Sequence, residues 1–344
     1  MVVKRKNTWI SIGMIYACSV IGVGFASGNE IIHFFTSYGM SGFYGILTAS
    51  AIFSFVGFLL VNMCFRTGSY QLSDCYKATG GPFFASFAGL VGTLFSFCLF
   101  VLMLSAWTKI LDEIHAIPVY LRYIIYVILF VFYCVFDIQN KPLAGWMRLL
   151  ILSGTGTVLF TIVSGQLIHT FSYLVTGYRS WFLSAILYIG YNSFVSADML
   201  CKACKAADSR KSAVVGGVTG GAVLFILSFV FNLIFTLWYH GNHSFPMLDM
   251  AGVELVPIRI VFMCVLMLCI LYSGFNSGTI VIERIRKNMN IRPVTGAIIL
   301  SLLSMIALPV GFDALIYGIY PVFGFLGSFI VICFVIFYAF KKNR

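Results

Sequence analysis

The residue types that could do chemistry in this chain lie inside apolar stretches. Ser27, Asn29 and Glu30 follow a glycine-rich run in the first such stretch, and Asp198 lies in a later one. A carboxylate is costly to bury in a membrane helix and by default indicates a functional site. These acids therefore predict a binding or gating site whose place depends on the elements that carry them.

The composition determines what kind of elements those are. The chain has 344 residues, of which 60% are hydrophobic and 10% are charged, whereas a soluble domain carries about 25% charged residues. A soluble enzyme is excluded because there are too few charges to cover a globule. Long apolar runs, rather than short alternating strands, carry the hydrophobicity, which predicts an all-α polytopic membrane protein.

Apolar windows of roughly 20 residues, the length needed to cross a bilayer, predict ten transmembrane helices. They are drawn at 8–36, 41–63, 83–108, 119–136, 149–168, 181–201, 212–238, 258–283, 293–311 and 313–340. We expect one transmembrane domain over 1–344, in which 8–168 and 181–340 form two five-helix repeats. Because five is odd, the second repeat must be inverted in the membrane relative to the first.

The Lys and Arg residues predict the orientation, because they collect in cytoplasmic loops. With ten helices and a cytoplasmic N-terminus, the outer side receives only Lys109, Arg122, Arg179 and Arg259 of the 22 basic residues. The prediction is a multi-pass cell-membrane protein with both termini cytoplasmic, and its net charge of +11 needs no nucleic acid partner. Cleavage of the first segment as a secretory signal is an alternative, but it would invert this pattern.

Two glycines occupy matching positions in the two predicted repeats. Gly22 and Gly190 lie 168 residues apart, and so do Glu30 and Asp198. A glycine inside a helix costs about 1 kcal/mol relative to alanine, so we expect helices 1 and 6 to be interrupted there. Close packing of helices through small residues is the alternative.

A helix that breaks at the bilayer midplane exposes backbone N–H and C=O groups that can bind a solute and an ion. Opposed dipole ends at two such breaks would suit a zwitterion. The predicted substrate-binding residues are Gly22, Gly24, Phe25, Ala26, Ser27, Gly190, Tyr191 and Asn192.

A polar face in the eighth segment supports this site. Ser273, Asn276 and Ser277 share one side of a helix, and their oxygen atoms suit a hard cation such as Na⁺. Hydrogen bonding to a neighbouring helix is the alternative role for such residues.

At this point the residues resemble a known family. Gly22 to Ile31, Phe34-Phe35 and Tyr188 to Asn192 resemble the YkvI-type bacterial membrane proteins. That group is similar to the amino acid, polyamine and organocation superfamily, which has the LeuT-type fold of five plus five inverted helices. The resemblance implies a fold and a transport mechanism rather than a particular solute.

The resemblance also implies an ion site between the first and eighth helices. Matching the glycines puts it at the carbonyls of Cys18, Ile21 and Ser273, with the side chains of Asn276 and Ser277. Asn276 departs from the hydroxyl residue more usual there, which leaves the ion's identity open. Proton-coupled relatives can place a lysine from helix five in this spot, and no Lys lies in 149–168, which favours Na⁺ over H⁺.

The two acids have more than one possible role. Glu30 could line the outer vestibule, carry a proton or hold a substrate amine, and Asp198 could form an inner gate. The alternative for Asp198 is a pair with Lys202 one helical turn later. The segment around Phe245 to Leu248 is a candidate outer lid.

Other motifs carry less information. Cys201 and Cys204 form a lone CxxC for which a zinc site is a minor alternative, while the other cysteines are scattered as small core residues. Glu30 to His33 lacks the second copy that a di-iron site needs. No catalytic triad, zinc-protease or phosphate-loop pattern appears, so an enzyme is not expected.

Together these patterns predict a cation-coupled secondary transporter of a small polar solute, an amino acid or related amine, that works by alternating access. Na⁺ is the expected coupling ion, with no other cofactor. The alternative is a ligand sensor on the same fold that does not transport. The sequence identifies no protein partner.

Overall fold

The computed structural model describes residues 8–112, 117–136, 180–238, 245–250, 256–289, 291–306 and 312–342. Within these residues every regular element is a helix. In chain order they are α1 Thr8–Val20, α2 Val23–Ala26, α3 Asn29–Phe34, the 3₁₀ turn η1 Thr36–Tyr38, α4 Ser41–Thr67, α5 Leu72–Asp112, α6 Val119–Val135, α8 Trp181–Cys204, α9 Arg210–Trp238, α10 Pro246–Met250, α11 Val256–Met289, α12 Pro293–Met305 and α13 Phe312–Lys342.

Several of these helices are built to cross a membrane. Five described stretches are long and apolar enough to do so, namely Ser41–Thr67, Leu72–Asp112, Arg210–Leu237, Arg259–Arg286 and Gly318–Phe340. Each predicted segment coincides with helical structure, except 149–168, which lies outside the described residues. The predicted all-helical membrane fold is therefore confirmed, whereas the count of ten helices is not tested.

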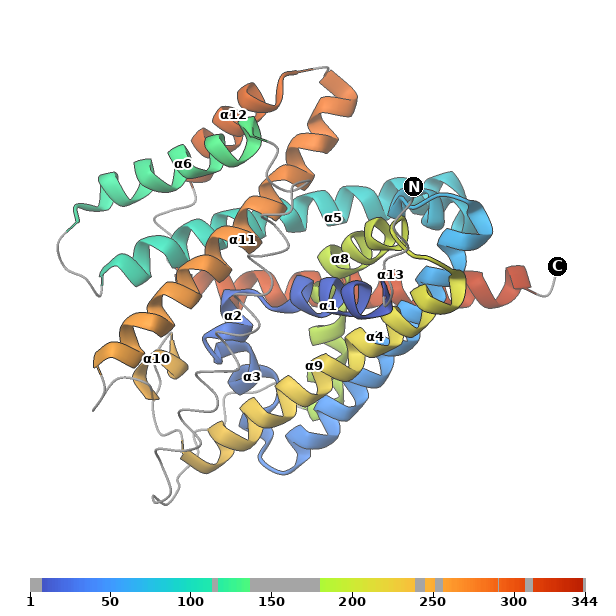
Figure 1. The fold of residues 1–344 in the computed structure, drawn as a ribbon, viewed down its shortest axis with the longest axis horizontal. Coiled ribbons are helices and arrows are strands. Elements are labelled where there is room, and N and C mark those ends of the chain that lie inside the picture. The colour runs from blue at the N-terminus through green and yellow to red at the C-terminus, as the bar shows by residue number, and fades with distance from the viewer. Residues whose placement is uncertain are drawn as a thin grey trace.

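Helices far apart in sequence form the core (Figure 1). The helix α9 packs against α4 and α1, α8 lies between α13 and α4, and α11 packs on α5. The pair α6 and α12 lies beside α11 at one edge. This arrangement surrounds the short helices α2 and α3 with α8, α9 and α11.

Glycines allow the close contact between α9 and its neighbours. A side-chain carbon on Gly57 of α4 would come within 2.8 Å of the Gly217 carbonyl oxygen on α9. On the other side of α9, a carbon on Gly216 would lie 2.7 Å from Cβ of Ile12 on α1. The glycine-rich stretch 216–221 thus serves close packing of helices through small residues.

A kink divides α5 into a short first part and a long second part. Gly81 has φ 84° and ψ 180°, a backbone conformation that a residue with a side chain rarely adopts. Pro82 follows, and because proline has no backbone N–H it cannot donate a hydrogen bond to the preceding turn. The short part, Leu72 to Gly80, can therefore point in a different direction from the long part.

Candidate functional site

The first apolar segment is broken where its glycines predicted. The helix α1 ends at Val20, Gly22 has an extended backbone with φ −95° and ψ −170°, and α2 begins at Val23 without a side-chain cap. A second interruption follows at Gly28, whose φ is 86°. Because the ring of Phe235 occupies the space where a Gly28 side chain would lie, only glycine fits there. The predicted break in helix 1 is confirmed.

The break lets the Glu30 side chain fold back over Gly24. A carbon on Gly24 would lie only 2.6 Å from Cγ of Glu30, so the glycine leaves the space that the carboxylate occupies. The Glu30 side chain is buried, and its Oε1 accepts a 2.9 Å hydrogen bond from the Tyr320 hydroxyl. Its other oxygen, Oε2, has no hydrogen-bond partner. A half-satisfied buried carboxylate is unstable unless a cation, a donor or a proton compensates it.

Aromatic rings surround this carboxylate. The Tyr320 ring stacks on Tyr191 of α8, with centroids 4.4 Å apart and planes 4° from parallel. The ring of Phe34 of α3 packs on the rings of both Tyr191 and Tyr188, with ring centroids 5.5 Å apart in each pair. The hydroxyls of Tyr188 and Tyr191 are buried and have no hydrogen-bond partner. Hydroxyl groups that a polar ligand could engage thus lie close to the Glu30 carboxylate.

The predicted second break is absent, and this prediction was wrong. The helix α8 continues from Trp181 to Cys204 through Gly190. The polar residues after the glycine bond within the helix, because Asn192 Nδ2 donates to the Tyr188 carbonyl at 3.1 Å and Ser193 Oγ to the Ile189 carbonyl at 2.6 Å. These side chains therefore satisfy helix carbonyls instead of marking an interruption.

Gly190 has a packing role instead. Its Cα faces α13, where a side-chain carbon would collide with the Gly324 carbonyl and lie 2.7 Å from the Ser328 amide nitrogen. A side-chain carbon on Gly327 of α13 would likewise collide with the Gly190 carbonyl oxygen. The alternative of close packing through small residues is therefore correct for helix 6.

The polar face of α11 lies opposite the break in the first helix. The nearest atom to a side-chain carbon on Gly22 would be Ser273 Oγ, at 3.6 Å. Ser277 Oγ donates to the Ser273 carbonyl at 2.7 Å, and the Tyr133 hydroxyl of α6 donates to Asn276 Oδ1 at 2.9 Å. Asn276 Oδ1 retains a second lone pair that could face a cation. The Ser273 carbonyl also accepts the Ser277 N–H within α11, so a cation there would have to displace the Ser277 hydroxyl.

A cavity of about 40 Å³ joins the break, α8 and α11. This volume has room for a few water molecules only. The predicted site residues that line it are Cys18, Gly22, Glu30, Tyr191, Asn192, Ser273, Asn276 and Ser277. Binding of a larger solute therefore requires this site to widen.

Seven predicted site residues do not line this cavity. They are Ile21, Gly24, Phe25, Ala26, Ser27, Gly190 and Asp198. Phe25 packs on Phe231 of α9 with ring centroids 5.4 Å apart. The Ser27 carbonyl accepts a 2.9 Å hydrogen bond from the Met247 N–H of α10. This bond joins the segment 245–248 to the end of α2, and the lid role stays a prediction.

A second cavity, of about 580 Å³, lies beside the half of α8 that follows Tyr191. Asp198, Lys202, Glu283 and Arg284 contribute to its lining. Lys202 Nζ lies 2.9 Å from Asp198 Oδ2 on its own helix and 3.5 Å from Glu283 Oε2 on α11. The pair that we considered as the alternative for Asp198 is thus present, and Lys202 also links two helices.

Residues that the sequence did not single out complete the small cavity. Tyr320, Phe95 and Met103 line it beside the predicted residues. With 18 Tyr and 35 Phe in the chain, no pattern distinguishes these three from ordinary packing residues.

Comparison with solved structures shows the class of fold: the chain, with its broken first helix packed among α8, α9 and α11, has a LeuT-type fold. A Na⁺-coupled sialic acid symporter in a substrate-bound, outward-open state is similar, with 12% identity and a TM-score of 0.63 over 97% of this chain and 79% of that one. MhsT in complex with L-phenylalanine is 15% identical, with a TM-score of 0.63 over 95% of this chain and 88% of that one. At such identities the likeness shows the fold.

In sequence, the chain is similar to the membrane protein YkvI of Bacillus subtilis strain 168. The two are 22% identical over 336 residues, which cover 94% of each. No protein-family model matches the sequence. The resemblance to YkvI-type membrane proteins with a LeuT-type fold is thereby confirmed.

Proposed function

We propose that this protein is a secondary transporter that moves a small polar solute, an amino acid or related amine, by alternating access. The observation that carries the proposal is the buried Glu30 carboxylate at the helix break, with Oε2 lacking a hydrogen-bond partner beside a cavity. A transported ammonium group would supply both the charge and the donors that this oxygen lacks. Two buried tyrosine hydroxyls nearby are further partners for a polar solute.

The continuous α8 refines what the solute must offer. Two opposed helix breaks would suit a zwitterion, but of the two helices predicted to break only the first is interrupted. The strongest recognition element is therefore the carboxylate of Glu30, which selects for a positive group. We expect the amine to contribute more to affinity than any carboxylate that the solute carries.

Na⁺ is the coupling ion in this proposal. The Ser273 carbonyl, Asn276 Oδ1 and the Ser277 hydroxyl lie beside the cavity next to Cys18 and Gly22. Oxygen ligands of this kind suit a hard cation, and each already has an internal hydrogen bond that holds it in place. Ile21 does not line the cavity, so we assign the carbonyls on the first helix to Cys18 and its lining neighbours Ser19 and Val20.

The two cavities support an inward-facing state, given cytoplasmic termini. On the outer side, α10 is bonded to the end of α2 through Met247 and Ser27, and Phe34 packs on Tyr188 and Tyr191. On the inner side, the larger cavity reaches Asp198 and the exposed Lys202. In this proposal Asp198 belongs to the inner gate of one transmembrane domain in the cell membrane. That gate is open here, because the cavity beside Asp198, Lys202 and Glu283 is present.

A screen of the purified protein by thermal unfolding tests the recognition step. Amino acids and simple amines are added in sodium buffer and in potassium buffer. We expect stabilisation by a subset of compounds that carry an amine, and a larger effect in sodium. Stabilisation only by compounds that lack an amine would contradict the proposal, and stabilisation without uptake by proteoliposomes would favour a sensor.

A further inference from the structure

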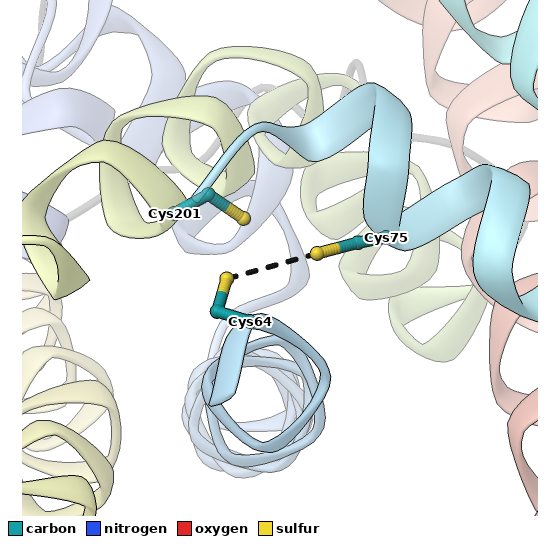
Figure 2. A group of neighbouring side chains, drawn as sticks. All are labelled: Cys64, Cys75 and Cys201. Carbon is teal, nitrogen blue, oxygen red and sulfur yellow. Dashed lines mark hydrogen bonds between the residues drawn. The ribbon is translucent and has the colours of Figure 1, made fainter. Parts of the chain in front are cut away.

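Three cysteines from different helices converge where α4 ends, α5 begins and α8 ends. Cys64 lies four residues before Gly68, which follows α4, Cys75 lies in the short part of α5, and Cys201 lies in the last turn of α8. Figure 2 shows their side chains pointing toward one another, so that the three sulfur atoms form a triangle. The CxxC motif suggested a different pair, Cys201 with Cys204.

The separations fit a shared metal ion. The three sulfur atoms lie within 4.8 Å of one another, and those of Cys64 and Cys75 are 3.7 Å apart. A disulfide would require about 2.05 Å. Two sulfurs bound to one ion at about 2.3 Å each, in tetrahedral to trigonal geometry, lie about 3.8–4.0 Å apart. The cluster therefore approaches the geometry of a thiolate metal site without needing large movements.

We propose that Cys64, Cys75 and Cys201 bind one thiophilic d¹⁰ metal ion through their three sulfur atoms. All three side chains are fully buried, which excludes competing water from the ion. Within the described residues, the group contains no His, Asp or Glu ligand. Soft thiolate ligands select Cu(I) or Zn(II) over hard cations such as Na⁺ and Mg²⁺.

The number of ligands favours Cu(I) over Zn(II). Structural zinc sites are almost always four-coordinate, whereas Cu(I) is stable with three thiolates. The ion could enter through the 580 Å³ cavity. This cavity is lined by close sequence neighbours of Cys75 and Cys201, namely Leu72, Ser73, Tyr76 and Lys202. Binding would release thiol protons and would tie α4, α5 and α8 together. This site is separate from the Glu30 site and does not depend on the proposed transport function.

The test uses the full-length protein, purified under reducing conditions and loaded with Cu(I) or Zn(II) against a competing chelator. We expect one equivalent of Cu(I) per chain, held more tightly than Zn(II). Cys64→Ser, Cys75→Ser and Cys201→Ser should each weaken binding by more than about 100-fold, beyond the usual cost of losing an outer-shell partner. Cys204→Ser is the matched control, because it lies on α8 outside the cluster and should bind normally.

X-ray absorption of the loaded wild-type protein needs no variant, so its result does not depend on whether the serine variants fold. We expect three sulfur neighbours at about 2.3 Å. Absence of retained ion in the wild type would overturn the proposal. So would equal retention by the Cys64→Ser variant, loss of binding in the Cys204→Ser control, or a shell of oxygen or nitrogen neighbours.

Discussion

The Tyr320 hydroxyl on α13 donates a 2.9 Å hydrogen bond to Oε1 of Glu30 on α3, joining residues 290 positions apart in sequence. The same tyrosine ring stacks on Tyr191 of α8. One side chain therefore links the last described helix to the helix break and to α8. This arrangement fixes the Glu30 carboxylate and leaves its Oε2 free for a ligand.

Glu30→Gln should remove the recognition of amines. The amide retains a hydrogen-bond acceptor for Tyr320 but loses the negative charge, which is worth about 2 kcal/mol or roughly thirtyfold in affinity. Titration of the stabilising solute, followed by thermal unfolding, measures this. Asp112→Asn is the control, because it removes a carboxylate that does not line the cavity and should leave amine binding unchanged. Unchanged affinity in Glu30→Gln would refute the role of the carboxylate.

Gly24→Ala should also weaken solute binding, although no contact between Gly24 and solute is proposed. The added methyl group would occupy the space of the Glu30 side chain and displace the carboxylate. Gly22→Ala provides the matched comparison in the same break, because its nearest neighbour would be Ser273 Oγ at an ordinary 3.6 Å. We expect at least a tenfold weaker affinity for Gly24→Ala than for Gly22→Ala, which corresponds to about 1.4 kcal/mol. Equal affinities would show that the fold of Glu30 over Gly24 is unimportant.

Replacement of Asn276 and Ser277 by Ala should abolish the dependence of solute binding on sodium. The double variant removes two of the oxygen ligands beside the cavity and leaves the backbone of α11 intact. Thr279→Ala serves as the control, because its hydroxyl bonds to the Asn276 carbonyl and does not line the cavity. Sodium titration monitored by solute affinity is the measurement. Sodium dependence that persists in the double variant would contradict the ion-site assignment.

Gly190→Ala should destabilise the protein by about 1–3 kcal/mol, the usual cost of overpacking. The methyl group would collide with the backbone of α13 at Gly324. Gly92→Ala in α5 is the control, since its nearest neighbour would be Phe194 Cδ1 at 3.5 Å and alanine favours a helix. Thermal unfolding of both variants measures the difference. A Gly190→Ala protein as stable as the wild type would show that the packing with α13 is loose.

Gly22 and Gly190 show how much of the helix structure the sequence could predict. Each glycine is followed by polar residues inside an apolar segment, and only Gly22 breaks its helix. The difference comes from the surroundings of Gly190, where Gly324 and Gly327 allow α13 to approach closely. Those partners lie more than 130 residues away in sequence. Local propensity therefore predicted a weak point in both helices but could not determine which would be used for packing.

Long-range partners account for the other differences. Glu30 was predicted to be functional because a buried acid is costly, but its partner Tyr320 is one of 18 tyrosines. Likewise, Cys64 and Cys75 are single cysteines and Cys201 belongs to a CxxC motif with Cys204, so the three meet only because α4, α5 and α8 converge. The ionic contact between Asp198 and Lys202 was predictable, since it is local to one helical turn.

Uptake by proteoliposomes tests the central claim most directly. Wild-type and Glu30→Gln proteins are reconstituted at equal density, and a labelled amine that stabilises the wild type is supplied with an inward sodium gradient. The account predicts accumulation above equilibrium by the wild type, its loss when the gradient is collapsed, and none by Glu30→Gln. Equal uptake by both proteins, or none by a wild type that still binds the amine, would contradict it.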